Sequence, residues 1–306
     1  MVVPERISGV LSPVVTPFKD DLSPDPHRLV QHCRWLLSQN VGLAPFGTTS
    51  EGNSLSVEEK MSLLDGLIDA GIDTARLMPG TGHCALADTV KLTNYAVKLG
   101  CAGTLMLPPF YYKDVSDDGL YASFAEVIDR VGSSELRIYL YHIPPIAQVG
   151  ISPPLVERLA KTFPETVVGI KDSSGDWNNT NAFLQLDLDD FRVFAGSESF
   201  LLQNMRAGGA GCISATANVN PAAINQLYAD WQSNVADDMQ QGLDKVREII
   251  EKFPMIPALK ATIAEFSDDP QWAIVRPPLV ALSDDQRSEL LKDLHQTAFE
   301  LPSLTD

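Results

Sequence analysis

Short apolar runs rich in β-branched residues recur along the first two-thirds of the chain. Each run is too short for a helix, and glycine, proline, serine or aspartate bounds it, a pattern typical of strands buried on both faces. We predict strands in eight runs: residues 9–15, 41–46, 75–79, 104–107, 137–142, 167–170, 191–195 and 211–214.

Amphipathic stretches separate these runs, and several begin with residues that favour helix starts. Ser56 and Glu59 have the spacing of a capping box ahead of an apolar stripe. Further helices are predicted to begin at the N-cap residues Ser116, Ser152, Ser199 and Asn220.

Strands and helices that alternate eight times predict an α/β fold with a parallel sheet. At this length the pattern favours a closed (β/α)8 TIM barrel, which typically takes about 250 residues. An open, doubly wound sheet is the alternative. It is disfavoured because no GxGxxG follows the first strand and no GxxxxGKS/T occurs in the chain.

The last quarter of the chain lacks strand-like runs. Apolar positions from Met239 to Phe253 keep helical spacing, and Ser283 with Gln286 forms a second capping box. We therefore predict a barrel in residues 1–231 and a helical C-terminal extension in residues 232–306 that packs on it.

Composition narrows the function classes. The chain has 44% hydrophobic and 21% charged residues, as in ordinary globular proteins, and its formal net charge is −17. Such an acidic chain is a poor binder of nucleic acids and anionic membranes, and no apolar run approaches the roughly 18 residues of a membrane span. Four cysteines without a CxxC pair, and no signal-peptide pattern, predict a cytoplasmic protein.

Lys171 is the first candidate for chemistry, because it directly follows the predicted strand 167–170 and barrel enzymes act at the carboxyl ends of their strands. One interpretation is a structural lysine that extends to solvent or pairs with Asp172 or Glu198. The other is a desolvated amine with a lowered pKa that forms a Schiff base with a carbonyl substrate.

Two further groups follow neighbouring strands. Tyr141 ends the strand before Lys171, and a phenol can relay protons during imine formation; an ordinary strand aromatic is the alternative. Gly47 opens a turn in which Thr48 and Thr49 offer hydroxyl and N–H donors to a carboxylate. An ordinary loop that caps the next helix is the alternative there.

Other kinds of site lack their sequence patterns. The five histidines form no HxH or HExxH spacing, so no metal site is predicted. Serine hydrolase chemistry lacks a GxSxG elbow. His142 alternates with Tyr141 along one predicted strand and is expected to point away from the barrel axis.

Four segments, in order along the chain, resemble the signature segments of the dihydrodipicolinate synthase / N-acetylneuraminate lyase family. They are Gly47-Thr48-Thr49-Ser50-Glu51, Tyr141-His142-Ile143-Pro144, Gly169-Ile170-Lys171-Asp172 and Gly208-Gly209-Ala210-Gly211-Cys212-Ile213-Ser214. With weaker matches at residues 9–18 and 276–279, the resemblance covers nearly the whole chain.

The resemblance implies a class I aldolase on a (β/α)8 barrel that uses neither metal nor cofactor and is often tetrameric. Lys171 would form the imine with pyruvate or another 2-oxo acid. Tyr141 would relay the proton, with Thr48 and Tyr112 as its hydrogen-bonded companions. The residue that matches Tyr112 reaches into a neighbouring subunit in synthases of the family.

The substrate pocket is also implied by the resemblance. Thr49, in the turn that Gly47 opens, would hold the substrate carboxylate, and Ile213 would line the pyruvate pocket. Two departures stand out: Ser50 replaces the common glycine of the turn, and Ile146 replaces an arginine that binds the carboxylate of the aldehyde in dihydrodipicolinate synthases. Loss of that arginine removes a bidentate carboxylate clamp.

The segment Pro109-Phe110-Tyr111-Tyr112-Lys113 resembles 2-keto-3-deoxy sugar acid aldolases of the same family, so such an aldolase is the preferred hypothesis. Pyruvate and an aldehyde would be the substrates, and the protein a homo-oligomer, dimer or tetramer. The enzyme alternatives are dihydrodipicolinate synthase and a 2-oxo or imino acid dehydratase or deaminase. A catalytically silent regulatory barrel and a metal-dependent barrel enzyme are further alternatives.

Overall fold

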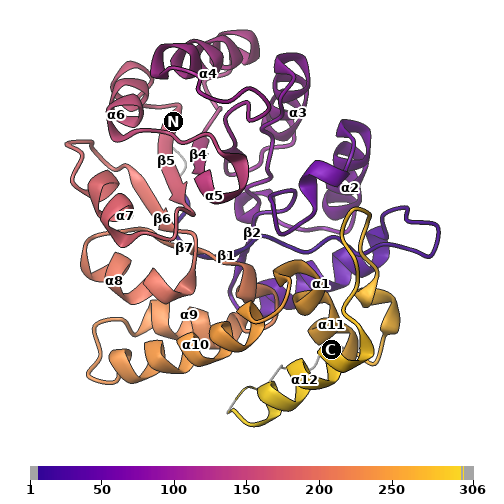
Figure 1. The fold of residues 1–306 in the computed structure, drawn as a ribbon. Coiled ribbons are helices and arrows are strands. Elements are labelled where there is room, and N and C mark those ends of the chain that lie inside the picture. Colours follow the sequence, from indigo (N-terminus) through magenta and orange to yellow (C-terminus); the bar gives the residue numbers. More distant parts are fainter. Residues whose placement is uncertain (1–5, 298, 300–306) are drawn as a thin grey trace. The chain divides into compact units, whose positions relative to one another are not determined.

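Helices and parallel strands alternate along most of the chain (Figure 1), of which the computed structural model describes residues 6–297 and residue 299. The described residues form two units. One comprises the residues up to Gly9 together with Asp73–Ile213, and the other comprises Val10–Ile72 together with the residues from Ser214 onward.

The first unit is built on a parallel sheet whose strands lie side by side in chain order. The strands are β3 (Thr104–Met106), β4 (Ile138–His142), β5 (Val167–Asp172), β6 (Arg192–Ala195) and β7 (Gly211–Ile213). Its helices are α3 (Leu86–Lys98), α4 (Asp117–Val131), α5 (Pro144–Ala147), α6 (Pro153–Thr162), α7 (Trp177–Leu184) and α8 (Leu201–Arg206).

The second unit contains β1 (Gly9–Ser12, whose first residue belongs to the first unit) and β2 (Gly42–Leu43), which pair in parallel. Its helices are α1 (Pro26–Ser38), α2 (Val57–Asp69), α9 (Pro221–Ala229), α10 (Ala236–Glu251), α11 (Met255–Phe266) and α12 (Asp284–His295). Both predicted capping boxes, Ser56 with Glu59 and Ser283 with Gln286, are present.

Two local predictions were wrong. Residues 75–79 were expected to form a strand, but Thr74–Arg76 is a 3-10 helix, because the Asp73 side chain accepts a hydrogen bond from the Ala75 N–H and starts a turn. Only a single bridge, between Gly80 and Leu105, joins the following residues to β3. The described residues thus contain seven strands, where eight were expected.

Ser199 does not cap the helix that follows it. It lies inside a 3-10 helix, Glu198–Phe200, whose N-cap is Ser197, and α8 continues directly from this turn. Ser197 takes the capping role because its hydroxyl accepts a hydrogen bond from the Ser199 N–H at 3.1 Å.

Alternate residues of the central strands face different surroundings. Ile138, Leu140 and Ile170 pack with helices α4, α6 and α7, which cover one face of this sheet (Figure 1). Burial of each such side chain stabilises the fold by about 1.5–3 kcal/mol. The intervening residues, among them Tyr139, Tyr141 and Lys171, therefore face the opposite side of the sheet.

The C-terminal helices share a core with earlier segments of the second unit. Val15 and Val219 pack with residues of α10, α11 and α12, among them Ile250, Leu259 and Leu290. The domain boundary at residue 231 stays a prediction. No helix in the described residues combines the length and apolar character needed to cross a bilayer.

Gly169 lets β5 approach its neighbours closely. A Cβ at this position would lie 2.5 Å from the Arg192 carbonyl oxygen and 2.6 Å from the Tyr139 ring. Tyr139 is fully buried, and its hydroxyl accepts a hydrogen bond from the Ile7 N–H at 3.0 Å, so the ring has little freedom to retreat. Burial raises the pKa of this phenol to about 12.

Gly169→Ala is expected to lower the free energy of unfolding by about 1–3 kcal/mol, because the added methyl group overpacks a closed site. Equilibrium unfolding in urea would measure the change. Gly66→Ala is the matched control, since its Cβ would meet only the Pro26 Cβ, at 3.7 Å, in the middle of α2. That variant should gain about 0.5–1 kcal/mol. Equal stability of the two variants would contradict the packing argument.

Candidate active site

Lys171 and Tyr141 lie side by side at the carboxyl ends of β5 and β4. Their Cα atoms are register partners, and the Lys171 Nζ lies 4.3 Å from the centre of the Tyr141 ring. Both residues are buried, with 4% and 3% of their surfaces exposed. The structure therefore brings together the predicted nucleophile and the predicted proton relay within one unit.

The amine of Lys171 has no acidic partner within the described part of its unit. Among the described residues of its unit, no carboxylate forms an ion pair with it, neither Asp172 nor Glu198. The Asp172 carboxylate instead accepts hydrogen bonds from the Ser174 N–H at 2.9 Å and the Thr180 hydroxyl at 2.6 Å. The structural interpretation of Lys171 as half of an ion pair is thus not observed. A buried amine without a counter-charge is the arrangement that nucleophilic catalysis by lysine needs.

His142 and Asp172 form a second pair on the other face of the same two strands. The His142 ring meets the edge of Phe183 on α7, as expected for a side chain that points away from Tyr141. Its Nδ1 accepts a hydrogen bond from the Ile151 N–H at 2.9 Å, so in the neutral ring the proton sits on Nε2, 3.9 Å from the Asp172 carboxylate. Burial lowers the pKa of His142, although Asp172 opposes the shift.

The two remaining predicted site residues of this unit differ in solvent exposure. Ile213 is fully buried at the end of β7. Tyr112 is 75% exposed and meets Tyr111 edge to face, with ring centres 5.4 Å apart. No hydrogen bond joins Tyr112 to Tyr141 among the described residues of this chain. The companion role of Tyr112 therefore stays a prediction.

The turn that contains Thr48 and Thr49 belongs to the second unit. It closes through hydrogen bonds from the Glu51 N–H to the Thr48 carbonyl and from the Gly52 N–H to the Gly47 carbonyl, both 3.0 Å long. A Cβ at Gly52 would lie 2.1 Å from the Phe46 carbonyl oxygen, so this corner requires glycine. The Ser50 carbonyl accepts a hydrogen bond from the Thr16 hydroxyl at 2.7 Å.

Several donors in this turn are unused. Neither the Thr49 N–H nor its hydroxyl makes a hydrogen bond to another described residue, and the fully buried Ser50 hydroxyl has no partner among them. A Cβ added to Gly47 would find open space within 4 Å. Unsatisfied N–H and O–H donors in a turn with open space at Gly47 suit a carboxylate ligand.

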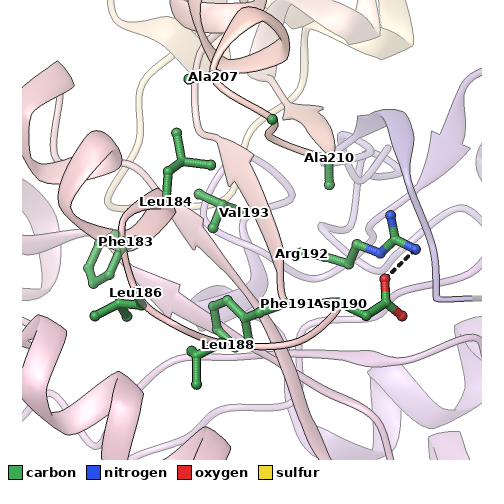
Figure 2. Close-up of a pocket in the computed structure, with 11 residues that line it drawn as sticks. Phe183, Leu184, Leu186, Leu188, Asp190, Phe191, Arg192, Val193, Ala207 and Ala210 are labelled. Carbon is green, nitrogen blue, oxygen red and sulfur yellow. Dashed lines mark ion pairs between the residues drawn. The ribbon is translucent and has the colours of Figure 1, made fainter.

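A cavity of about 280 Å³ lies elsewhere in the first unit, at the amino ends of β6 and β7 (Figure 2). Leu184, Leu186 and Leu188 line it, and Arg192 and Asp190 point toward each other in a 2.7 Å ion pair, away from these leucines. In the register of β5 and β6, Lys171 lies opposite Phe194, two residues beyond Arg192. This cavity is therefore separate from the lysine.

The sequence analysis missed two side chains that hold residues adjacent to the candidate site residues. Thr180 holds the Asp172 carboxylate, and Lys260 pairs with Glu51 at the end of the threonine turn. Only the apolar context of Lys260, inside the run Met255–Phe266, could have marked it as a buried charge. The described residues contain no group of three or more histidine, cysteine, aspartate or glutamate side chains arranged to hold a metal ion.

Known proteins resemble this chain over nearly its full length. An uncharacterized DapA-like lyase from Chloroflexus aurantiacus is 33% identical over 285 residues, covering 92% of this chain and 94% of that protein. The crystal structure of dihydrodipicolinate synthase from Agrobacterium tumefaciens has 32% identity and a TM-score of 0.89, covering 95% of this chain and all of that one.

A third structure is YagE, a prophage protein of the dihydrodipicolinic acid synthase family from Escherichia coli K12, in complex with pyruvate. It has 25% identity and a TM-score of 0.89, and the match covers 97% of this chain and 100% of that one.

These matches define the class of protein: an α/β enzyme of the TIM-barrel fold, acting as a class I lyase. The model of the dihydrodipicolinate synthetase family matches residues 6–297, and the chain belongs to that family. Its fold class, its enzyme class and its family were thus all predicted from the sequence.

The buried imidazole of His142 should make the folding stability of the protein depend on pH. Its pKa lies below the ordinary 6.5, so the unfolded chain binds this proton more readily than the folded chain. The stability that neutral His142 contributes is present above about pH 6.5 and is lost as the pH falls through its lower folded pKa.

We expect His142→Asn to lose less stability than the parent protein between about pH 7.5 and about pH 5. Urea unfolding midpoints at both pH values would measure this. His27→Asn, which removes an exposed imidazole, is the control and should keep the parent's pH dependence. Identical acid sensitivity in the parent and His142→Asn would argue against a buried neutral imidazole.

Proposed function

We propose that this enzyme is a pyruvate-dependent Schiff-base aldolase whose nucleophile is Lys171. The observation that carries the proposal is the buried Lys171 amine, which has no carboxylate partner in its unit and lies 4.3 Å from the Tyr141 ring. The pyruvate complex of the similar YagE protein supports pyruvate as the first substrate.

The reaction follows from these groups. The Lys171 amine attacks the carbonyl carbon of pyruvate, and the Tyr141 phenol supplies the proton with which the carbinolamine loses water. The resulting iminium draws electrons from the adjacent methyl group, which gives up a proton to the Tyr141 phenolate to form an enamine. The enamine carbon then forms a bond to the carbonyl carbon of an aldehyde, and the aldehyde oxygen takes the proton back from Tyr141. Hydrolysis releases the product and restores the amine, and cleavage runs through the same steps in reverse.

The proposal also assigns roles to the other predicted site residues. Thr49 and Gly47 bind the pyruvate carboxylate, which the unused Thr49 donors and the open space beside Gly47 support. Thr48 and Tyr112 accompany Tyr141 in proton transfer, and Ile213 lines the pyruvate pocket.

A 2-keto-3-deoxy sugar acid is the proposed substrate class. Ile146 stands five residues after Tyr141 and is 65% exposed, so it offers an apolar surface where synthases carry an arginine. A hydroxylated, uncharged aldehyde loses nothing from that change, whereas an aldehyde with a carboxylate loses its bidentate partner. Dihydrodipicolinate synthesis, and dehydration or deamination of a 2-oxo or imino acid, are the alternatives.

The proposal includes a cytoplasmic homo-oligomer, dimer or tetramer. Tyr111, Tyr112 and Ile146 expose large apolar surfaces, which favours a second copy of the chain over solvent. The four cysteines form no disulfide, which favours a reducing compartment.

Borohydride reduction in the presence of pyruvate is expected to leave a covalent pyruvyl adduct on Lys171. Reduction converts the imine to a stable secondary amine, and peptide mass spectrometry locates it. Lys171→Ala should yield no adduct and no turnover. Lys161→Ala, which removes an exposed lysine paired with Glu157, is the matched control and should keep both. An adduct on another lysine, or none, would refute the assignment.

The substrate class is tested by comparing two reactions. The protein should cleave 2-keto-3-deoxy sugar acids with a kcat/KM at least about tenfold above that for condensing pyruvate with the carboxylate-bearing aldehyde of dihydrodipicolinate synthases. Ile146→Arg should lower the KM for that aldehyde, because it supplies a guanidinium, and Ile146→Gln should not. Faster condensation than cleavage by the parent protein would favour the synthase alternative.

A further inference from the structure

Lys260 is a fully buried lysine at the centre of α11, a helix in which every residue from Pro257 to Ala264 is buried. Its amine donates a hydrogen bond to the Ile274 carbonyl at 2.7 Å and forms an ion pair with the Glu51 carboxylate. The side chains of Lys260 and Glu51 are both completely inaccessible to solvent. Both residues belong to the second unit.

The Glu51 carboxylate is held on its other oxygen as well. The Arg276 N–H donates a hydrogen bond to it at 2.9 Å. Lys260 and Arg276 also lie over the Phe18 ring, at 4.4 Å and 4.7 Å from its centre. Two residues from the C-terminal part of the chain thus fix both oxygens of one carboxylate.

Glu51 is also part of the threonine turn. Its backbone N–H donates to the Thr48 carbonyl, and its φ of 54° lies in the left-handed region that side chains seldom adopt. A residue in that region persists only where its surroundings hold it. The buried ion pair supplies that restraint at the residue that closes the turn.

Arg276 extends the same restraint beyond the turn. Its guanidinium donates to the Ser54 carbonyl at 2.6 Å and pairs with the Glu59 carboxylate, which caps α2. The segment that follows the turn is therefore attached to the C-terminal part at Glu51, Ser54 and Glu59.

A buried ion pair is a costly way to stabilise a core, since apolar residues of similar volume often serve as well. Burial lowers the pKa of Lys260 to about 8, although Glu51 opposes the shift. The pair is accordingly better explained by the geometry that it imposes than by net stability.

We propose that Lys260 and Glu51 are positioning residues, whose buried ion pair holds the Thr49 donors in the geometry that binds the substrate carboxylate. The inference rests on the proposed function, in which Thr49 binds pyruvate. It assigns to the C-terminal part of the chain a role in substrate affinity, without contact with the substrate.

The test separates affinity from folding. Borohydride trapping over a range of pyruvate concentrations gives two quantities for each variant: the half-saturating pyruvate concentration and the maximal fraction of Lys171 modified. Lys260→Met and Glu51→Gln should each raise the half-saturating concentration by about 10- to 100-fold, because the turn loses its restraint. The maximal fraction modified should stay close to that of the parent protein.

The double variant Lys260→Met/Glu51→Gln decides between positioning and stability. It removes both charges, so no buried charge is left unpaired and thermal stability should recover relative to the single variants. The half-saturating pyruvate concentration should nevertheless stay high. Recovery of pyruvate affinity together with stability would overturn the proposal, and so would a fall in the maximal fraction modified at unchanged half-saturation.

Arg28→Met is the matched control. Arg28 forms 2.6 Å ion pairs with Asp25 and Asp269 in the same unit, and among the described residues it makes no ion pair or side-chain hydrogen bond to the turn. Its loss should leave the half-saturating pyruvate concentration unchanged, and a rise equal to that of Lys260→Met would overturn the proposal.

Thr49→Val separates failure of this inference from failure of the proposed function. If Thr49→Val weakens pyruvate binding and the Lys260 variants do not, only the positioning role is wrong. If Thr49→Val and the Lys260 variants all leave the half-saturating concentration unchanged, the Thr49 hydroxyl does not bind the carboxylate and the positioning role is overturned with it. Absence of any adduct in the parent protein overturns both.

Discussion

Residue alternation along two adjacent strands is the constraint on which the candidate site depends. On β4 and β5, one set of side chains packs with α4, α6 and α7, and the other set contains Tyr141 and Lys171. A strand that is buried on both faces can bring a lysine into an apolar interior without a counter-charge. Burial of the amine costs free energy, and the packing of the opposite face of the strand against the helices offsets that cost. The burial of the Lys171 amine is thus a product of fold stability, and Gly169 contributes to it by letting β5 lie close to Arg192 and to the Tyr139 ring.

Much of this arrangement follows from the sequence. The runs 137–142 and 167–170 are rich in apolar residues; the first ends in Tyr141-His142, and Lys171 directly follows the second. Their strands and the meeting of tyrosine and lysine could therefore be predicted. The run 75–79 is also mostly apolar, but the side chain of Asp73 forms a turn that the pattern of the run does not reveal. Ser199 was expected to cap α8, yet Ser197, two residues earlier, takes that role for the preceding turn. In both cases a nearby side chain accepts the backbone hydrogen bond that begins a 3-10 turn, and the apolar pattern does not show which side chain will do so.

Contacts across long sequence separations could not be predicted. Glu51 and Lys260 are 209 residues apart, and no sequence pattern around either residue indicates the other as its partner. The hydrogen bond from the Ile151 N–H to His142 spans only nine residues, but it could not be predicted either, since a backbone donor is independent of side-chain identity. The sequence could propose candidates for reactive groups from their residue types, but not the groups that hold them in place, because positioning depends on distance in space.

The Glu51–Lys260 pair bears on the smallest chain that can act as this enzyme. Every strand among the described residues ends by Ile213, so a protein shortened after α9 would keep the whole sheet. It would also keep Glu51, but without Lys260 and Arg276, the two residues that hold its carboxylate. On the positioning role proposed for this pair, the helices after α9 belong to the enzyme and are not open to exchange between relatives or to removal in engineering. Insertions and fusions that spare activity belong in exposed loops, away from α11 and the segment that contains Arg276.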